Sequence, residues 1–192
     1  MALPFTDEQR SVIRERLLES ARRHAIHSGP QKTSLDTLTS DAGISKSSFY
    51  KFFDSKEQLF LLVAHQWEGE ILSAAMRALD SHQSDKQRAA ALVFTAFECI
   101  HQMGLVRFMR EDLPYLNTFV PRDAASEHIR SSAAAIFDAL KRARIHFTVP
   151  DSVALSTISL IYLSLLNMND VGEDFFPALR ELVCGACDRL VC

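Results

Sequence analysis

The sequence has few of the residues that break or cross-link a chain: six glycines, six prolines and four cysteines among 192 residues. Three of the cysteines, Cys184, Cys187 and Cys192, crowd at one end, so no disulfide framework is expected and a reducing compartment is indicated. The longest apolar run, residues 153–168, is interrupted by four hydroxyl residues and is shorter than the roughly 20 residues that span a membrane. Positive charge is not in excess, with 21 Lys and Arg against 24 Asp and Glu. These absences exclude a disulfide-rich secreted domain, a membrane-spanning helix and a protein that coats nucleic acid through its overall charge.

The sequence does contain sustained helical periodicity. Hydrophobic residues make up 47% of the chain, and strand-like alternation is nowhere sustained, so we predict an all-α fold of about nine helices. The predicted helices cover residues 7–27, 33–43, 45–53, 56–80, 85–102, 105–112, 123–144, 151–169 and 174–191. The first eight residues lack the basic and apolar pattern of a secretory signal, so a cytoplasmic location is expected.

Charge is distributed unevenly along the chain. Residues 1–56 hold nine Lys and Arg against seven Asp and Glu, whereas residues 57–192 hold twelve against seventeen. Any surface that binds a polyanion is therefore expected near the N-terminus.

Residues 33–56 carry the pattern of two short helices joined through Gly43, whose conformational freedom permits the left-handed turn that lets the helices cross steeply. The apolar residues spaced to face one small core are Leu35, Leu38, Ala42, Ile44, Phe49 and Phe53. The residues that the second helix presents outward are Lys46, Ser47, Tyr50 and Lys51. Cations and hydroxyl groups bind phosphates and base edges, so the pattern predicts a DNA-binding helix-turn-helix.

This segment resembles the N-terminal domain of the TetR family of bacterial transcriptional repressors. The likeness covers about the first 65 residues and depends on the order and spacing of Thr33, Leu35, Leu38, residues 42–46, Tyr50, Phe53 and residues 55–59. The sequence departs from the family's usual pattern at Thr39, Ser47 and Phe52, where Ala, Gly and His are frequent. Since Ser47 and Phe52 lie in or beside the recognition helix, the resemblance does not give the operator sequence.

The resemblance implies which residues meet DNA. The residues that match positions near base edges are Lys46, Ser47 and Lys51. The residues that match phosphate-binding positions are Thr33 or Ser34, Ser48, Tyr50 and Lys56, and Ser45 caps the recognition helix between them. The helix N-termini at Thr33 and Ser55 add partial positive charge that favours phosphate. We therefore expect a DNA-binding domain over residues 1–56 that recognises a palindromic double-stranded operator.

The resemblance also implies that residues 57–192 form a helical domain that binds a small effector and joins two subunits. Eight of the thirteen phenylalanines lie beyond residue 90, which indicates an apolar or amphipathic effector. The side chains expected to line its pocket are Trp67, Phe94, Phe97, Met103, Phe108, Met109, Tyr115 and Tyr162, with Glu98, His101 and Asn167 as polar contacts. The last two helices, apolar over residues 153–168 and at Leu179 and Leu182, are expected to form a homodimer interface. The effector is then expected to release a repressor from DNA, and no cofactor is expected.

Other functions have less support in the sequence. Cys184 and Cys187 lie one helical turn apart, but a zinc site needs four ligands and no second pair has a suitable spacing. The seven histidines are scattered and no nucleophile or metalloprotease motif occurs, so no enzyme is expected. An architectural or protein-interaction member of the same fold, without an effector, remains as the alternative.

Overall fold

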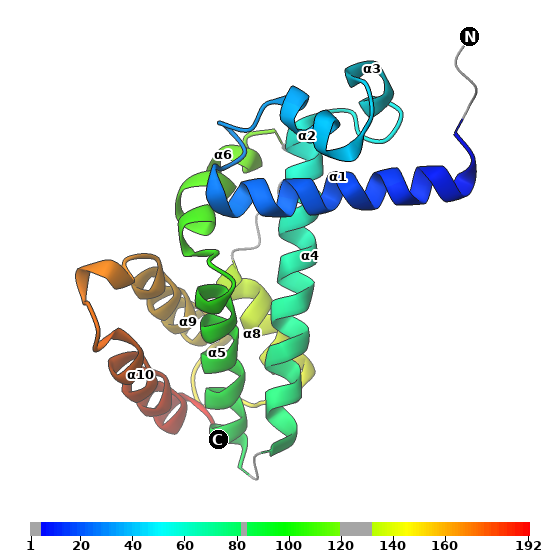
Figure 1. Cartoon of the computed structure of the whole chain (residues 1–192). Helices are drawn as coiled ribbons and strands as arrows, with labels where there is room; N and C mark the ends of the chain where they lie inside the picture. Colours follow the sequence, from blue (N-terminus) through cyan, green and yellow to red (C-terminus); the bar gives the residue numbers. More distant parts are fainter. Residues whose placement is uncertain (1–4, 82–83, 120–131) are drawn as a thin grey trace. The chain divides into compact units, whose positions relative to one another are not determined.

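The computed structural model describes residues 5–81, 84–119 and 132–192, and most of this part of the chain is helical (Figure 1). Within these residues, extended backbone pairs only in an isolated bridge between Phe147 and Val191. The prediction of an all-α fold is confirmed.

The helices of the described residues are given in chain order. Their bounds are α1 (Asp7–His27), α2 (Leu35–Ala42), α3 (Lys46–Phe49), α4 (Lys56–Arg77), α5 (Asp85–Gln102), α6 (Leu113–Asn117), α8 (Ser132–Arg142), α9 (Asp151–Leu166) and α10 (Phe175–Leu190). The described residues also form two 3₁₀ turns, Ala78–Ser81 and Met168–Asp170, and a π-helical turn, Phe108–Asp112.

Several predicted bounds need correction. The recognition helix ends at Phe49 and continues only as turns, because Lys51 and Phe52 donate their backbone N–H groups three residues back. The helix predicted to end at Asp112 becomes a π-helical turn there, and α6 carries the chain on to Asn117 with Pro114 in its first turn, where a missing N–H group is tolerated. Residues 123–131 of the predicted helix 123–144 lie outside the described residues.

The chain forms two compact units, and each is discontinuous in sequence. Unit 1 comprises residues 1–66 and 107–122, and unit 2 comprises residues 67–106 and 123–192. In unit 1, α2 packs on both α1 and α3, and the fully buried side chains include Leu17, Leu38, Phe49 and Phe60.

In unit 2, α5 packs on α8, α9 and α10, and α8 also packs along α9 (Figure 1). The largest side chains buried completely among these helices are Phe97, Leu92, Ile100 and Ile136. Among the described helices, none has the length and apolar character that crossing a membrane requires.

Candidate nucleic-acid interface

The turn between α2 and α3 is built as its sequence requires. Gly43 has φ +71° and ends α2 in the left-handed conformation, and its N–H group donates to the carbonyls of Thr39 and Ser40. Ser34 caps α2 by accepting from the N–H of Thr37, and Ser45 caps α3 by accepting from the N–H of Ser48. The two helices therefore start and stop at defined residues, which fixes the angle of the recognition helix.

The exposed face of the recognition helix carries hydroxyls and cations. The Ser45 hydroxyl lies 3.0 Å from the hydroxyls of both Ser47 and Ser48. Tyr50 is 59% exposed and its ring stands edge-on to the buried ring of Phe49, with centroids 5.6 Å apart. The face is therefore held from below by a buried aromatic ring and offers polar groups outward.

Lys46 is held by an acid on the neighbouring helix. Its ammonium lies 2.8 Å from the carboxylate of Asp36, in the first turn of α2, and both side chains are more than half exposed. An exposed pair of this kind contributes little free energy and exchanges easily with a phosphate or a base. The Lys46 ammonium is thus held at the surface of α3 by a contact that DNA can replace.

The start of α1 adds cations that the sequence patterns did not single out. The guanidinium of Arg10 lies over the ring of Phe52 at 5.4 Å and donates to the carbonyl of Lys51 at 3.4 Å. The guanidinium of Arg14 lies over the ring of Phe53 at 5.2 Å. Phe52, a departure from the family pattern, therefore joins α1 to the end of the recognition helix and gathers cations beside it. In the sequence, only the basic residues on one face of helix 7–27 indicate that this helix could add cations to the DNA-binding surface.

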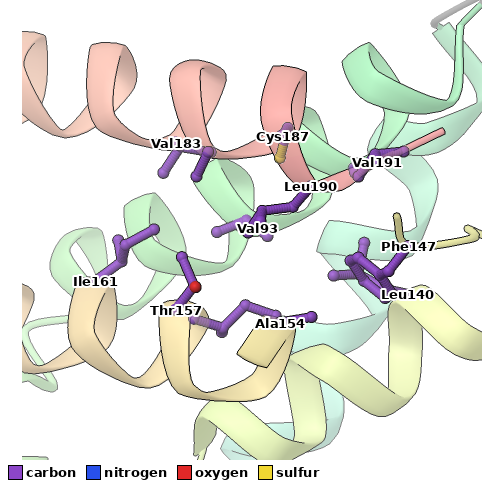
Figure 2. A pocket seen from close by; sticks show the side chains of 13 residues that line it. Val93, Leu140, Phe147, Ala154, Thr157, Ile161, Val183, Cys187, Leu190 and Val191 are labelled. Atoms are coloured by element: carbon purple, nitrogen blue, oxygen red, sulfur yellow. The ribbon is translucent and has the colours of Figure 1, made fainter. Parts of the chain in front are cut away.

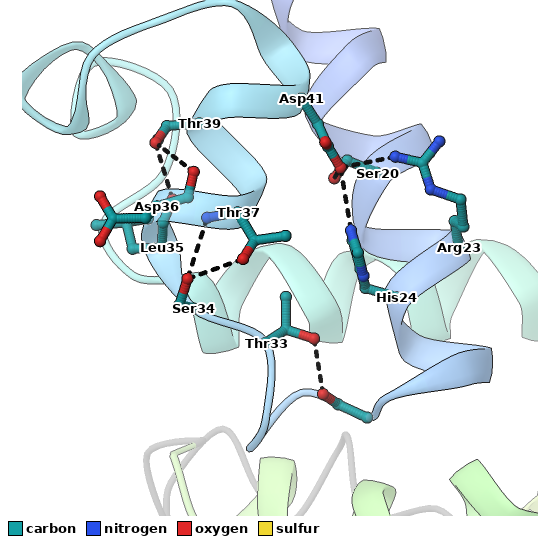
Figure 3. Close-up of polar contacts among 11 residues, drawn as sticks. Ser20, Arg23, His24, Thr33, Ser34, Leu35, Asp36, Thr37, Thr39 and Asp41 are labelled. Atoms are coloured by element: carbon teal, nitrogen blue, oxygen red, sulfur yellow. Dashed lines mark hydrogen bonds and ion pairs between the residues drawn. The ribbon is translucent and has the colours of Figure 1, made fainter.

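A carboxylate joins α1 to α2. One oxygen of Asp41 accepts from the Ser20 hydroxyl at 2.6 Å, from Arg23 at 2.6 Å and from the His24 ring Nε2 at 3.0 Å (Figure 3). These bonds, chiefly that from Ser20, lower the pKa of the Asp41 carboxyl, while burial opposes them. The three donors lie within about one turn of α1, so together they hold α1, which supports the recognition helix, against α2.

Two of the predicted phosphate-binding residues have internal partners. Thr33 is 3% exposed and its hydroxyl donates to the carbonyl of Gly29 at 2.8 Å (Figure 3). The Lys56 ammonium donates to the carbonyls of Pro30 and Thr33 at 2.9 and 2.8 Å. Of the pair Thr33 or Ser34, only Ser34 is exposed. Both Thr33 and Lys56 stabilise the connection between α1 and α2 in the free protein.

An ion pair between a buried carboxylate and a partly exposed guanidinium supports the same connection. Arg107 donates to Asp112 at 2.8 Å and to the carbonyls of Ala25 and Ile26 at 2.7 and 3.1 Å, at the end of α1. Burial raises the pKa of the Asp112 carboxyl, and Arg107 opposes that rise. Gly29, with φ +81°, lies so close that an added Cβ would be 2.8 Å from the Asp112 Oδ1 atom. No local sequence pattern indicates this contact, because it joins residues about 80 positions apart.

The residues predicted to bind an effector fall in different places. Phe108 and Tyr115 belong to unit 1, where the pKa of Tyr115 is raised by burial and by Glu57. The predicted residues that belong to unit 2 are Trp67, Phe94, Phe97, Glu98, His101, Met103, Tyr162 and Asn167. Within that unit the rings of Phe97 and Tyr162 lie 6.4 Å apart. The rings of Phe94 and His101 each lie against Phe176, at 6.3 and 4.7 Å.

An apolar hollow lies elsewhere in unit 2, between α5, α8, α9 and α10 (Figure 2). The hollow is open to solvent, and its empty volume together with the solvent at its mouth is about 350 Å³. The space inside it is only about 20 Å³, enough for about one water molecule. Its lining consists of Ala89, Val93, Leu140, Phe147, Ala154, Thr157, Ile158, Ile161, Val183, Ala186, Cys187, Leu190 and Val191. None of the predicted effector-binding residues is among them. In the described residues no cluster of His, Cys, Asp and Glu could hold a metal ion.

Comparisons with known proteins agree with the helix-turn-helix geometry. Residues 17–63 match the model of the bacterial regulatory proteins of the tetR family. The HTH-type transcriptional activator FasR of Mycolicibacterium smegmatis is 29% identical over 138 residues, which make up 69% of this chain and 61% of that protein. The chain therefore matches less than two thirds of the length of this curated relative.

Solved structures resemble the whole chain. A TetR-family transcription regulator from Shewanella sp. PV-4 has a TM-score of 0.65 at 18% identity and covers 94% of this chain and 98% of its own. FadR of Bacillus subtilis, in complex with stearoyl-CoA, has a TM-score of 0.66 at 14% identity and covers 90% and 96%. These likenesses show the fold. Residues 17–63, which include the helices that present Lys46 and Tyr50, thus match the N-terminal domain of the tetR family of bacterial regulatory proteins, and the chain as a whole has the fold of solved members of that family.

Proposed function

We propose that this regulator is a repressor that binds a palindromic operator as a homodimer and leaves it when an acyl-type effector binds. The exposed face of α3, with Lys46, Ser47 and Tyr50 above the buried Phe49, is the observation that carries the proposal. A protein with this task works where the chromosome lies, in the bacterial cytoplasm.

The proposed roles in DNA binding follow the chemistry of the exposed face. Lys46, Ser47 and Lys51 meet base edges in the major groove, and Lys46 exchanges Asp36 for DNA. The phosphate contacts come from Ser34, Ser48, Tyr50, Arg10 and Arg14. Thr33 and Lys56 contribute mainly by stabilising the connection between α1 and α2, through their hydrogen bonds to backbone carbonyls. Lys56 has one further N–H donor for a phosphate.

The proposed dimer forms through α9 and α10. Val153, Leu160 and Leu163 lie on one face of α9 and are 45%, 68% and 52% exposed, and Leu182 of α10 is 58% exposed. Such side chains gain free energy when a second copy covers them, and two copies related by a two-fold axis place their recognition helices on half-sites about 34 Å apart. Leu179, by contrast, is buried within its own subunit.

The proposed effector class comes from one solved structure. FadR of Bacillus subtilis has a similar fold and holds stearoyl-CoA, and the helical unit 2 of this chain is rich in apolar side chains. We therefore propose a fatty-acyl thioester or fatty acid. The name of FasR favours a second candidate, transcriptional activation, in which the same DNA contacts recruit polymerase instead of excluding it.

The proposal is tested by selecting operators from a random DNA pool and titrating the complex with acyl-CoA thioesters. We expect a two-fold symmetric consensus and release by long acyl chains but not by coenzyme A alone. Tyr50→Ala should weaken binding to every selected sequence, whereas Ser47→Ala should change the consensus. Recovery of no consensus sequence would refute operator binding, and a reporter gene that falls when the regulator is removed would establish the activator.

A further inference from the structure

The residue that precedes α1 packs outside its own helix. Thr6 caps α1 by accepting from the N–H of Gln9, and the Gln9 side chain accepts from the N–H of Thr6, at 3.2 and 3.0 Å. Beside such a capping box, an apolar residue before the cap often packs on an apolar residue four positions after it. That position holds Arg10, which is exposed. Phe5 instead packs on another element, where its ring centroid lies 5.9 Å from that of Phe52.

Two cations lie over the faces of these rings. The Arg10 guanidinium is 5.4 Å from the centroid of the Phe52 ring, and the Lys51 ammonium is 5.5 Å from the centroid of the Phe5 ring. Both distances are within the range of about 6 Å at which an aromatic ring attracts a cation. Arg10 also donates to the Lys51 carbonyl at 3.4 Å, so the two charged side chains belong to one small region of the surface. Each ring of the pair thus holds one cation.

The ring contacts leave hydrogen-bond donors of both cations available. A guanidinium that lies over a ring still has its N–H donors directed outward in its own plane. The one hydrogen bond of Arg10, at 3.4 Å, is long and therefore weak. Both side chains are exposed, and among the described residues neither forms an ion pair, whereas Lys46 is paired with Asp36. The region therefore offers two positive charges with unused donors, an arrangement that suits an anion.

We propose that Phe5 and Phe52 are positioning residues that place Arg10 against a backbone phosphate of the operator and Lys51 at the adjoining edge of the groove. This inference rests on the operator binding proposed above, and it adds two residues that act through the cations they hold. A free arginine or lysine side chain loses rotamer freedom when it binds, and the rings remove part of that freedom before DNA arrives. Phe52, a departure from the family pattern, thereby acquires a role in DNA binding.

The first experiment measures the ring contact in the free protein, without DNA. In NMR spectra of protein with labelled arginine, the side-chain protons of Arg10 should be shifted upfield, because they lie over the Phe52 ring. Phe52→Leu should remove this shift, and Phe52→Tyr, which keeps a ring, should retain it. Phe119→Leu is the matched control, since Phe119 is 49% exposed and contacts the ring of Tyr115 in α6, and it should leave the Arg10 signals unchanged. Unshifted Arg10 protons in the wild type would overturn the inference.

The second experiment measures operator affinity over a series of salt concentrations. Phe52→Leu should weaken binding about fivefold per subunit, equivalent to about 1 kcal/mol, because the cation–π contact and its restraint on Arg10 are lost. The slope of the salt dependence should stay that of the wild type, since both charges remain, whereas Arg10→Ala should lower it by about one per subunit. Phe52→Tyr should keep the wild-type affinity. Phe5→Leu should behave like Phe52→Leu, and it is expected to fold because Phe5 precedes the capped first helix.

A double-mutant cycle separates positioning from packing. In a protein that already carries Arg10→Ala and Lys51→Ala, Phe52→Leu should have no further effect on operator affinity. An equal effect with and without the cations would make Phe52 a packing residue and overturn the inference, as would wild-type affinity in both Phe5→Leu and Phe52→Leu. If selection yields no operator, the proposed function fails. The same cycle on a duplex of random sequence at low salt then decides the inference separately, because phosphate contacts do not depend on base sequence.

Discussion

Arg107→Ala should destabilise unit 1 strongly, because it leaves a carboxylate without its partner in a buried place. The Asp112 side chain is 6% exposed, and Arg107, itself 36% exposed, supplies it with a hydrogen bond of 2.8 Å. Removing one member of a fully buried pair costs about 3–5 kcal/mol, and the partial exposure of the arginine reduces that to about 2–4 kcal/mol. The carbonyls of Ala25 and Ile26 lose their donor as well.

The loss should depend on pH in a definite direction. The folded-state pKa of Asp112 is raised by burial, so its contribution to stability is present below the ordinary value of 3.8 and is lost as the pH rises through the folded pKa. Arg107 opposes the rise, and without it the folded pKa moves further up. The Arg107→Ala variant should therefore lose more stability than the wild type between pH 4 and pH 7.

Urea unfolding followed by circular dichroism at pH 4.5 and 7.5 measures both effects. Asp112→Asn serves as the matched control, because it keeps the shape and removes the charge. Adding Arg107→Ala to Asp112→Asn should cost less than half of what Arg107→Ala costs alone at pH 7.5. A cost for Arg107→Ala below about 1 kcal/mol at pH 7.5, or an unchanged pH dependence, would refute the reasoning.

Three further predictions concern other contacts. Asp41→Asn should lower the free energy of unfolding by about 1 kcal/mol at pH 7. Because the pKa of Asp41 is lowered in the folded protein, its carboxylate stabilises the fold at neutral pH and this contribution is lost as the pH falls through the folded-state pKa, so the variant should lose less stability below pH 4. Urea titrations at pH 3 and 7 check both expectations. Lys56→Met should lower the melting temperature and change the salt dependence of operator binding little. Lys51→Ala should reduce the slope of that salt dependence by about one and leave the melting temperature unchanged. The reverse pattern would make Lys56 the phosphate contact. Leu160→Asp with Leu163→Asp should give monomers of unchanged helicity in sedimentation, and an intact dimer would move the interface away from α9.

Local sequence was sufficient to predict the turns and helix ends that depend only on neighbouring residues. Gly43 and Ser45 marked the turn and the recognition helix because a left-handed residue and a capping hydroxyl act on their immediate neighbours. The helix Asp85–Gln102 has the predicted bounds for the same reason. The cap of α2 was misplaced by one residue, since Thr33 and Ser34 are both good caps and only the burial of Thr33 distinguishes them.

Features that depend on distant residues could not be predicted. Nothing near Asp112 in the sequence indicates that it is buried or that its partner also holds the end of α1. The hollow arises from alanines on three helices, and each alone is an ordinary core residue. The stacking of Arg10 on Phe52 could not be predicted without knowing that the start of α1 lies beside the end of the recognition helix.

The discontinuity of unit 1 affects how such regulators can be recombined. Residues 107–122 belong to the compact unit that carries the recognition helix, although 40 residues of unit 2 precede them in the chain. A chimaera that joins residues 1–56 to a foreign effector domain would keep Gly29 and the carbonyls of Ala25 and Ile26 but lose Arg107 and Asp112. Builders of hybrid biosensors should therefore transplant both pieces together, or choose a recipient whose own intervening segment carries an equivalent arginine and acid.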